Sequence, residues 1–244
     1  MSAVSDGGSI IGEVWDRATS SQPAPSLGLV VGTGILALLL VALPLSWRYT
    51  RHLVTIAHEA AHGVAALISG RRLEGIRLHS DTSGLTLSRG RRSGPGMVLT
   101  AFAGYVGPAL LGLGGAYLLW LGHPVGLLWL ALLLLALLLI QIRNWFGLWS
   151  VLISSVGVFA VSWWGSAVVQ SSFAYAGTWF LLLAAPRPVL ELQALRRRGQ
   201  ARSSDADMLA RLTRIPGIIW VLAFLASAGA ALAVGGSWLL RSAG

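Results

Sequence analysis

The sequence predicts an all-α polytopic membrane protein with about six to seven transmembrane helices and a small β-hairpin insert. Hydrophobic residues make up 55% of its 244 positions and charged residues only 11%, whereas roughly a quarter of the residues in a soluble domain are charged. The mean hydropathy is +0.71. Apolar runs of roughly 20 residues, enough to cross a hydrocarbon core as a helix, recur along nearly the whole chain. We therefore expect one membrane domain over residues 27–244.

The first 26 residues are polar and differ from the rest of the chain. They contain Asp6, Glu13 and Asp16 against a single base, Arg17. They lack the basic start of a secretory signal peptide. We predict that residues 1–26 form a disordered arm.

The hydrophobic pattern places the spans within 27–244, and one of them is unusual. The spans are predicted at 27–47, 52–69, 97–121, 125–142, 148–165, 172–190 and 216–240. The second is short and contains His52, His58, Glu59 and His62. Lipid excludes such side chains unless they face protein or a water-filled cavity, so this span is the first candidate for a functional site.

An Arg-rich segment at 71–93 follows that span. Its apolar residues partly alternate on either side of Asp81-Thr82-Ser83-Gly84. Alternation of this kind, interrupted by turn residues, is typical of two short strands. We expect a β-like insert with its turn at Ser83-Gly84.

The basic residues indicate the orientation and the compartment. All 18 are Arg, against nine acids, and they lie between apolar spans rather than on a folded basic module, which argues against nucleic-acid binding. If every span crosses fully, 71–93, 143–147 and 191–215 share one side with the N-terminal arm. Counted with Arg187 just before the last segment, this side holds 15 of the 18. The positive-inside rule makes that side cytoplasmic. We expect a multi-pass protein of a bacterial cytoplasmic membrane, with Arg196–Arg198 near lipid headgroups.

The sequence His58-Glu59-Ala60-Ala61-His62 predicts a zinc site inside the second span. Residues four apart lie on one face of a helix, so both imidazoles can bind one ion. Glu59, beside them, is suited to act as general base. The chain has no cysteine, so any further ligand must be His or a carboxylate. A pair of buried histidines hydrogen-bonded within a helix bundle is the alternative.

Several stretches together resemble the site-2 protease family, in particular its compact bacterial B-like branch. They are His58–Gly63 followed by Ile68-Ser69-Gly70, the β-like insert, Gly104-Tyr105-Val106-Gly107-Pro108, Arg143-Asn144-Trp145-Phe146-Gly147 and Ser204-Asp205-Ala206-Asp207. The resemblance implies an intramembrane zinc metalloprotease that cleaves a membrane-protein substrate in or near its transmembrane helix. Better-known members carry their third ligand, an Asp, in an Asp-Gly sequence on a later span, and this chain has no Asp-Gly.

The third ligand must therefore be sought elsewhere, because a catalytic zinc takes three protein ligands and water. After Glu59 the carboxylates are Glu74, Asp81, Glu191, Asp205 and Asp207. We favour Asp205 and then Asp207, since a helix capped by Ser203 or Ser204 can fold back towards the site. Plain helix capping is the alternative for both. By analogy with the family, Asn144 is a weak ligand or a donor to substrate backbone, or else an interfacial cap.

Two other readings of the function remain open. The chain can be an inactive zinc-binding membrane scaffold or regulator, or a transporter that relays ions or protons through His and Glu. Transporters often contain internal repeats, and the segment around His58 has no second copy. His52, His79 and His123 lack helical spacing to the pair and are expected at surfaces or interfaces.

Overall fold

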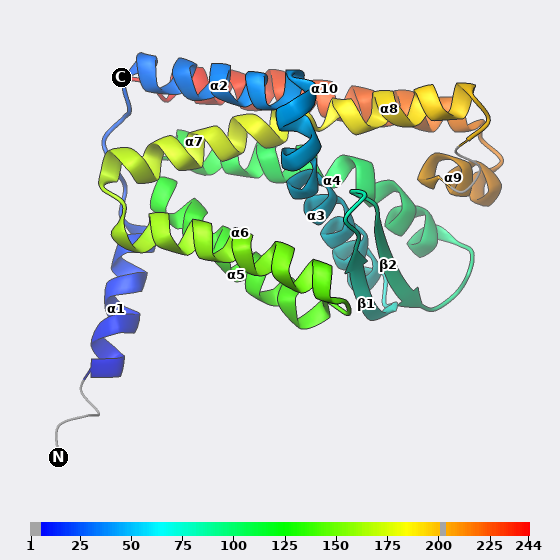
Figure 1. Ribbon diagram of the computed structural model, residues 1–244, viewed down its shortest axis with the longest axis horizontal. Helices are drawn as coiled ribbons and strands as arrows, with labels where there is room; N and C mark the ends of the chain where they lie inside the picture. The colour runs from blue at the N-terminus through cyan, green and yellow to red at the C-terminus, as the bar shows by residue number, and fades with distance from the viewer. Residues whose placement is uncertain (1–5, 201–203) are drawn as a thin grey trace.

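The computed structural model describes residues 6–200 and 204–244 and shows a helical protein with one β-hairpin (Figure 1). Within these residues, five units are long and apolar enough to cross a membrane: α4 (Pro95–Trp120), α5 (Pro124–Gln141), α6 (Trp145–Trp164), α7 with α8 (Ala167–Ala184 and Pro186–Arg197) and α10 (Gly217–Arg241). Many of their Leu, Ile, Val and Trp side chains are exposed, as lipid-facing positions require. The predicted all-α polytopic fold is confirmed.

The sixth span is broken. Helices α2 (Leu27–Ala42) and α3 (Pro44–Ile68) meet at an angle of 100°. Leu43 between them is extended, with φ −74° and ψ 129°, because the ring of Pro44 disfavours a helical conformation in the residue before it. At the break the Ser46 hydroxyl lies within hydrogen-bonding distance of the carbonyls of Leu39, Leu40 and Leu43. Leu39 O and Leu43 O also accept from Leu43 N and Trp47 N, so the hydroxyl matters most for Leu40.

This bend corrects the predicted topology. Spans 27–47 and 52–69 are not two straight crossings, because the first helix ends before Pro44 and the second begins there. Gln22 N donates to Gly122 O at 2.8 Å and Gly244 N to Pro25 O at 3.1 Å. Residues 22–25 therefore lie beside the C-terminus and the α4–α5 turn, at the end of the bundle opposite the hairpin (Figure 1). The N-terminal arm does not share a side with 71–93.

The arm itself contains a helix. We expected disorder over 1–26, but α1 covers Asp6–Thr19 and packs against α5. Arg17 pairs with Glu13 one turn earlier, at 2.6 Å, and its guanidinium stands 5.5 Å from the centre of the Trp163 ring. The polar residues that suggested disorder thus include an ion pair between neighbouring turns of a helix.

Helix α4 is the centre of the bundle, because it contacts α3, α7 and α10, and a larger share of it is buried than of α5, α6 or α10. Glycine residues of α4 allow the neighbouring helices to pack closely against it. A Cβ at Gly112 would lie 2.9 Å from the Leu182 side chain, and one at Gly115 the same distance from Thr178. Small residues let helix backbones approach closely in lipid, where no hydrophobic force drives the helices together.

The insert is an antiparallel hairpin of β1 (Arg72–Leu78) and β2 (Gly84–Arg89), as predicted. On the other side of β1, Ile76 and Ile142 form a parallel bridge and Arg143 N donates to Ile76 O at 2.9 Å. The turn lies one position earlier than expected, since Thr82 adopts positive φ (70°) and Gly84 already belongs to β2. The hairpin is therefore anchored to the α5–α6 connection.

Candidate metal centre

Helix α3 presents the two predicted histidines on one face. His58 Nε2 and His62 Nε2 lie 3.0 Å apart, and their ring planes are nearly perpendicular. His62 Nδ1 lies 2.7 Å from the carbonyl oxygen of Thr100 on α4. When Nδ1 donates to that carbonyl, the neutral ring keeps its lone pair on Nε2, the atom that faces His58. Helix α4 thus holds the His62 ring in an orientation that suits metal binding.

A glycine of α4 makes room for both rings. A Cβ at Gly104 would lie 2.3 Å from His62 Nε2 and 2.7 Å from His58 Cε1, and one at Gly107 would lie 2.2 Å from Ala61 Cβ. The stretch Gly104–Pro108 therefore serves close helix packing, and at Gly104 the close neighbours are the imidazoles themselves. Tyr105, next to it, packs edge-on against His58 with ring centres 4.8 Å apart.

Asp205 reaches the same point from a distant part of the chain. Its Oδ2 lies 3.3 Å from His58 Nε2 and 3.2 Å from His62 Nε2. The residue begins α9 (Asp205–Thr213), after Ser204, whose hydroxyl accepts from Asp207 N as the helix cap. Ala206 and Leu209 are fully buried among residues of α4, α8 and α10, so the apolar face of this short helix fixes the carboxylate.

Three ligand atoms thus stand at the corners of a nearly equilateral triangle with sides of 3.0–3.3 Å. Ligands about 2.0–2.1 Å from a tetrahedral ion lie roughly 3.3 Å from one another. His58, His62 and Asp205 are the group in the described part of the chain whose geometry fits a metal ion. Two imidazoles and one carboxylate form a ligand set of catalytic zinc sites.

The charge of Asp205 suits this role. Burial raises the pKa of its carboxyl, but hydrogen bonds with His58 and His62 and the charges of those rings outweigh that effect, so its pKa lies below the ordinary value. Those ring charges belong to the metal-free protein, because the imidazoles must be neutral to bind a cation. A carboxylate is already an anion at neutral pH at its ordinary pKa.

The other candidate carboxylates are engaged elsewhere. Asp207, the second choice, pairs with Arg196 and accepts from the Ser204 hydroxyl. Glu191 pairs with Arg51 and Arg187 and accepts from Trp47 Nε1. Glu74 pairs with Arg89, and Asp81 accepts from Ser83 in the hairpin turn. The structure thus separates Asp205 from the rest.

Asn144 is not brought to this group. Its side chain accepts from Leu78 N at 3.1 Å and donates to Leu78 O at 2.6 Å. The amide imitates a neighbouring strand and holds the end of β1 in place. A role of Asn144 in binding substrate stays a prediction.

Glu59 is 5% exposed and stands apart from the ligand triangle. Its Oε2 accepts from the Thr86 hydroxyl of β2 at 2.6 Å. Thr86 and Thr100, which touch Glu59 and His62, were not anticipated, because a lone Thr in a strand or helix carries no motif. The inward-facing position of Thr86 in the alternating pattern of β2 was the one available signal.

The three remaining histidines take no part in the ligand triangle. His52 lies against the Phe146 ring, His79 beside the Ser83 hydroxyl and His123 beside the Ser20 carbonyl.

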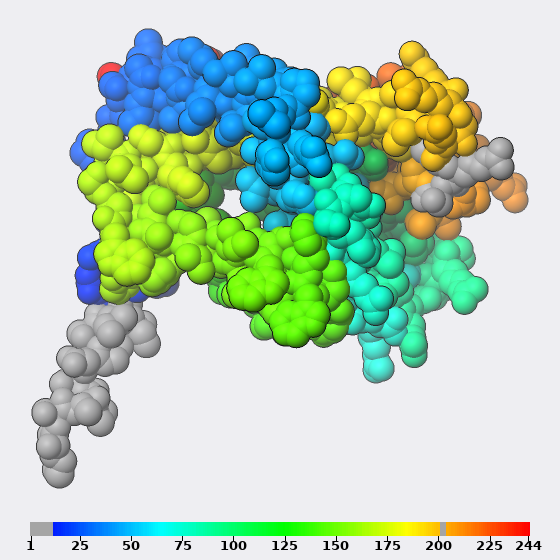
Figure 2. Space-filling view, in the orientation of Figure 1, coloured from blue at the N-terminus to red at the C-terminus, as the bar shows by residue number. Residues whose placement is uncertain are grey.

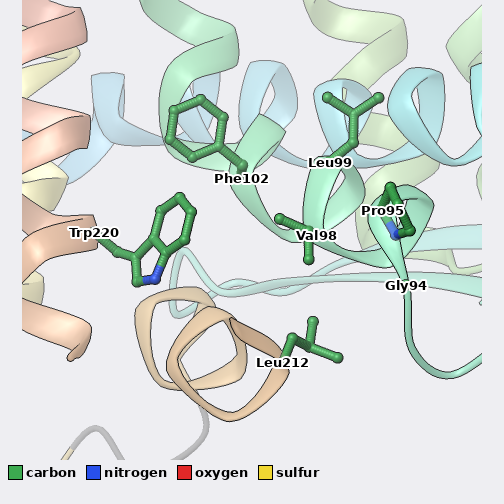
Figure 3. A pocket seen from close by; sticks show the side chains of 7 residues that line it. All are labelled: Gly94, Pro95, Val98, Leu99, Phe102, Leu212 and Trp220. Carbon is green, nitrogen blue, oxygen red and sulfur yellow. The ribbon is translucent and has the colours of Figure 1, made fainter. Parts of the chain in front are cut away.

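A separate open pocket of about 510 Å³ lies on α4 near the start of α10 (Figure 3). Its lining is apolar and comes from Gly94, Pro95, Val98, Leu99, Phe102, Leu212 and Trp220. A row of aromatic contacts connects the pocket to the candidate metal centre. Phe102 contacts both Trp220 and Phe224, and Phe224 stacks on Tyr105, which packs against His58. The pocket is lined by none of the candidate ligands, so it is separate from the candidate metal centre.

Residues 31–235 match the family of peptidase M50B-like proteins. Neither the curated proteins nor the solved structures gave a match to this chain. The family match covers both histidines, Glu59 and Asp205, and with the apolar helices it makes the chain an integral multi-pass membrane protein. The chain therefore belongs to the peptidase M50B-like family, a branch of the site-2 protease metallopeptidases.

Proposed function

We propose that this protein is a zinc-dependent endopeptidase that cleaves a peptide bond in or near a transmembrane segment of a membrane-protein substrate. One observation carries the proposal. Ligand atoms of His58, His62 and Asp205 converge within 3.0–3.3 Å inside a bundle of apolar helices, and Glu59, next to His58 in the chain, is buried between α3 and β2. Intramembrane ionisable residues mark functional sites, and these four have complementary roles.

A zinc ion bound by the three ligands supplies Lewis acidity, which polarises a scissile carbonyl and lowers the pKa of water. Glu59 accepts a proton from the water as the water oxygen bonds to the carbonyl carbon. The same carboxyl then gives that proton to the amide nitrogen as the C–N bond breaks. Burial of Glu59 among α3 and β2 keeps this proton from bulk solvent.

The hairpin offers a way to hold an extended substrate. Carbonyls in a helix are hydrogen-bonded, so a substrate helix must unwind before its backbone can react. In the described sheet β2 pairs with β1 alone, which leaves its outer edge free to add an extended segment. Leu85 and Leu87 are exposed on this strand and suit an apolar substrate.

The compartment follows from the arginines. The segment 71–93 that contains the hairpin, the α5–α6 connection and residues 187–214, α8 included, contain 14 of the 18 Arg residues. The described parts of these segments lie towards one end of the bundle (Figure 1). We place this end in the cytoplasm of a bacterial cell, beside anionic lipid, with the protein in the plasma membrane. Both Arg17 and Arg241 lie at the other end.

The test compares purified wild type with Glu59→Gln and His58→Ala. The probe is a synthetic helix of about 20 apolar residues with a central Gly-Asn-Pro, labelled at its ends with a fluorophore and a quencher. We expect about one zinc per wild-type chain by mass spectrometry and cleavage of the probe. The Gln variant should keep its zinc and lose cleavage by about 100-fold or more, and His58→Ala should lose both.

The same experiment examines the alternative of a zinc-binding scaffold. A scaffold would bind zinc in wild type and in Glu59→Gln, and neither protein would cleave the probe. Equal cleavage by wild type and Glu59→Gln would remove Glu59 from the mechanism and contradict the proposal.

A further inference from the structure

Strand β2 contacts the general base of the proposed reaction at two points. Gly84 and Thr86 are two residues apart, so they lie on one face of the strand, and that face meets α3. A Cβ at Gly84 would lie 2.4 Å from Glu59 Cγ and 2.5 Å from Glu59 Oε1. Thr86 contacts the other carboxylate oxygen. The glutamate side chain is thus confined between the hairpin and its own helix.

The contact with Thr86 is directional. Its hydroxyl lies 2.6 Å from Glu59 Oε2 and 3.0 Å from the Glu59 backbone oxygen. A hydroxyl has one hydrogen to donate, and the shorter contact is in the range of a charge-assisted bond to a carboxylate. The hydroxyl therefore donates to the Glu59 carboxylate, while its oxygen also lies beside the backbone carbonyl of the same residue.

The hairpin is itself fixed to α3, so this donor does not drift. Thr55 donates to the Thr82 carbonyl at 2.9 Å, one helical turn before Glu59. One turn after it, a Cβ at Gly63 would touch the side chains of Leu73 and Ile76 on β1. Contacts before and after Glu59 hold the hairpin along the same helix, and Thr86 lies between them.

We propose that Thr86 is a positioning residue, which orients the Glu59 carboxylate for proton transfer and so makes the β-hairpin part of the catalytic apparatus. This inference rests on the proposed peptidase function. The strand whose free edge suits the substrate would also hold the base. A substrate segment that pairs with β2 is thereby registered against Glu59.

The test uses Thr86→Val, which keeps the shape of the side chain and its preference for a strand but removes the hydroxyl, and Thr86→Ser, which keeps the hydroxyl. The matched control is Ser88→Ala, on the same face of β2, where the hydroxyl accepts from Arg71 Nε at 3.1 Å. With the probe helix, we expect kcat of Thr86→Val to fall about 10- to 100-fold, because a displaced base loses its alignment. Both KM and zinc content should stay within twofold of wild type.

Two further variants sharpen the result. Thr86→Ser should recover most of kcat, and Ser88→Ala should not change it. Gly84→Ala should lower kcat with Thr86 intact, because the added methyl pushes the carboxylate aside. Wild-type kcat in Thr86→Val, with Glu59→Gln inactive, would overturn the positioning role and leave the peptidase intact. Full activity in Glu59→Gln would instead remove the proposed function.

A measurement without catalysis tests the contact directly. In zinc-free protein, Thr86→Val should lower Tm by about 2–4 °C when Glu59 is present and by less than half of that shift in a Glu59→Ala background. Equal shifts in the two backgrounds would mean that the hydroxyl does not interact with Glu59, and would overturn the inference whatever substrate is used.

Discussion

The two halves of the candidate metal centre are built in different ways. His58 and His62 lie one turn apart on a 25-residue helix, so the spacing of the chain alone places them together. Asp205 belongs to a nine-residue helix and follows His62 by 143 positions. The position of Asp205 depends on the packing of Ala206 and Leu209 in the core. It also depends on the path of the whole chain between His62 and Asp205. Local geometry thus defines one half, and tertiary packing defines the other.

The largest expected effect concerns the local half. His58→Ala removes one of the two candidate ligands on α3, and we expect zinc content to fall from about one per chain to near zero by mass spectrometry. His52→Ala is the matched control, because this histidine lies on the same helix against Phe146. Loss of zinc in the control as well would show that α3 tolerates no change.

Asp205→Ala tests the half that depends on packing. Two imidazoles remain, and zinc affinity measured by competition with a chelator should fall by about 100-fold or more, beyond the change that loss of a supporting residue gives. Asp207→Ala removes the pairing with Arg196 and should change the affinity by less than fivefold. The reverse order would transfer the ligand role to Asp207.

Gly104→Ala tests the fit between α4 and the two rings. The added methyl would lie 2.3 Å from His62 Nε2, so we expect zinc affinity to fall about 10- to 100-fold. Gly114→Ala is the control, since a Cβ there meets nothing within 4 Å. Alanine favours a helix more than glycine does, so a general loss of stability does not account for the difference.

Leu209→Ala should weaken the anchor of α9 without touching a ligand. Truncation of a buried Leu costs about 2–5 kcal/mol, and part of this cost falls on the docking of α9. Hydrogen exchange of the α9 backbone should become faster and zinc affinity should fall several-fold. Leu195→Ala, on the exposed side of α8, should leave both unchanged. Unchanged exchange in Leu209→Ala would mean that other contacts hold Asp205.

Single cysteines give the smallest perturbation and test the topology. The chain has no cysteine, so Ser20→Cys and Ser83→Cys each introduce one exposed thiol at opposite ends of the bundle. In sealed vesicles of one orientation, a membrane-impermeant maleimide should label one of the two and spare the other. Labelling of both from the same face would restore the two-crossing path for residues 27–69.

The sequence was sufficient for the features that depend on near neighbours. Apolar length identified the membrane helices, alternation identified the hairpin, and the spacing of His58 and His62 identified their shared face. The break at Leu43 had its own signal in Pro44, but a hydrophobic window runs across a proline without interruption. For that reason, the prediction that the N-terminal arm shares a side with 71–93 was wrong.

Features that depend on distant neighbours were less accessible. The Ser-Asp-Ala-Asp stretch offered two carboxylates, and only the packing of Ala206 and Leu209 determines that Asp205 faces the histidines. Nothing in the order of residues relates Thr86 to Glu59 or Thr100 to His62, because those pairs form when the hairpin and α4 dock on α3. Asn144 lies with β1, where its amide pairs with backbone.

The distance along the chain between the ligands also has a consequence during synthesis. At about 5–20 residues per second, a ribosome needs roughly 7 to 30 s to advance from His62 to Asp205. Throughout that interval the nascent protein holds two of the candidate ligands and lacks Asp205. On the proposed mechanism, the peptidase would become active only after α9 has docked, when its first helices have already entered the membrane.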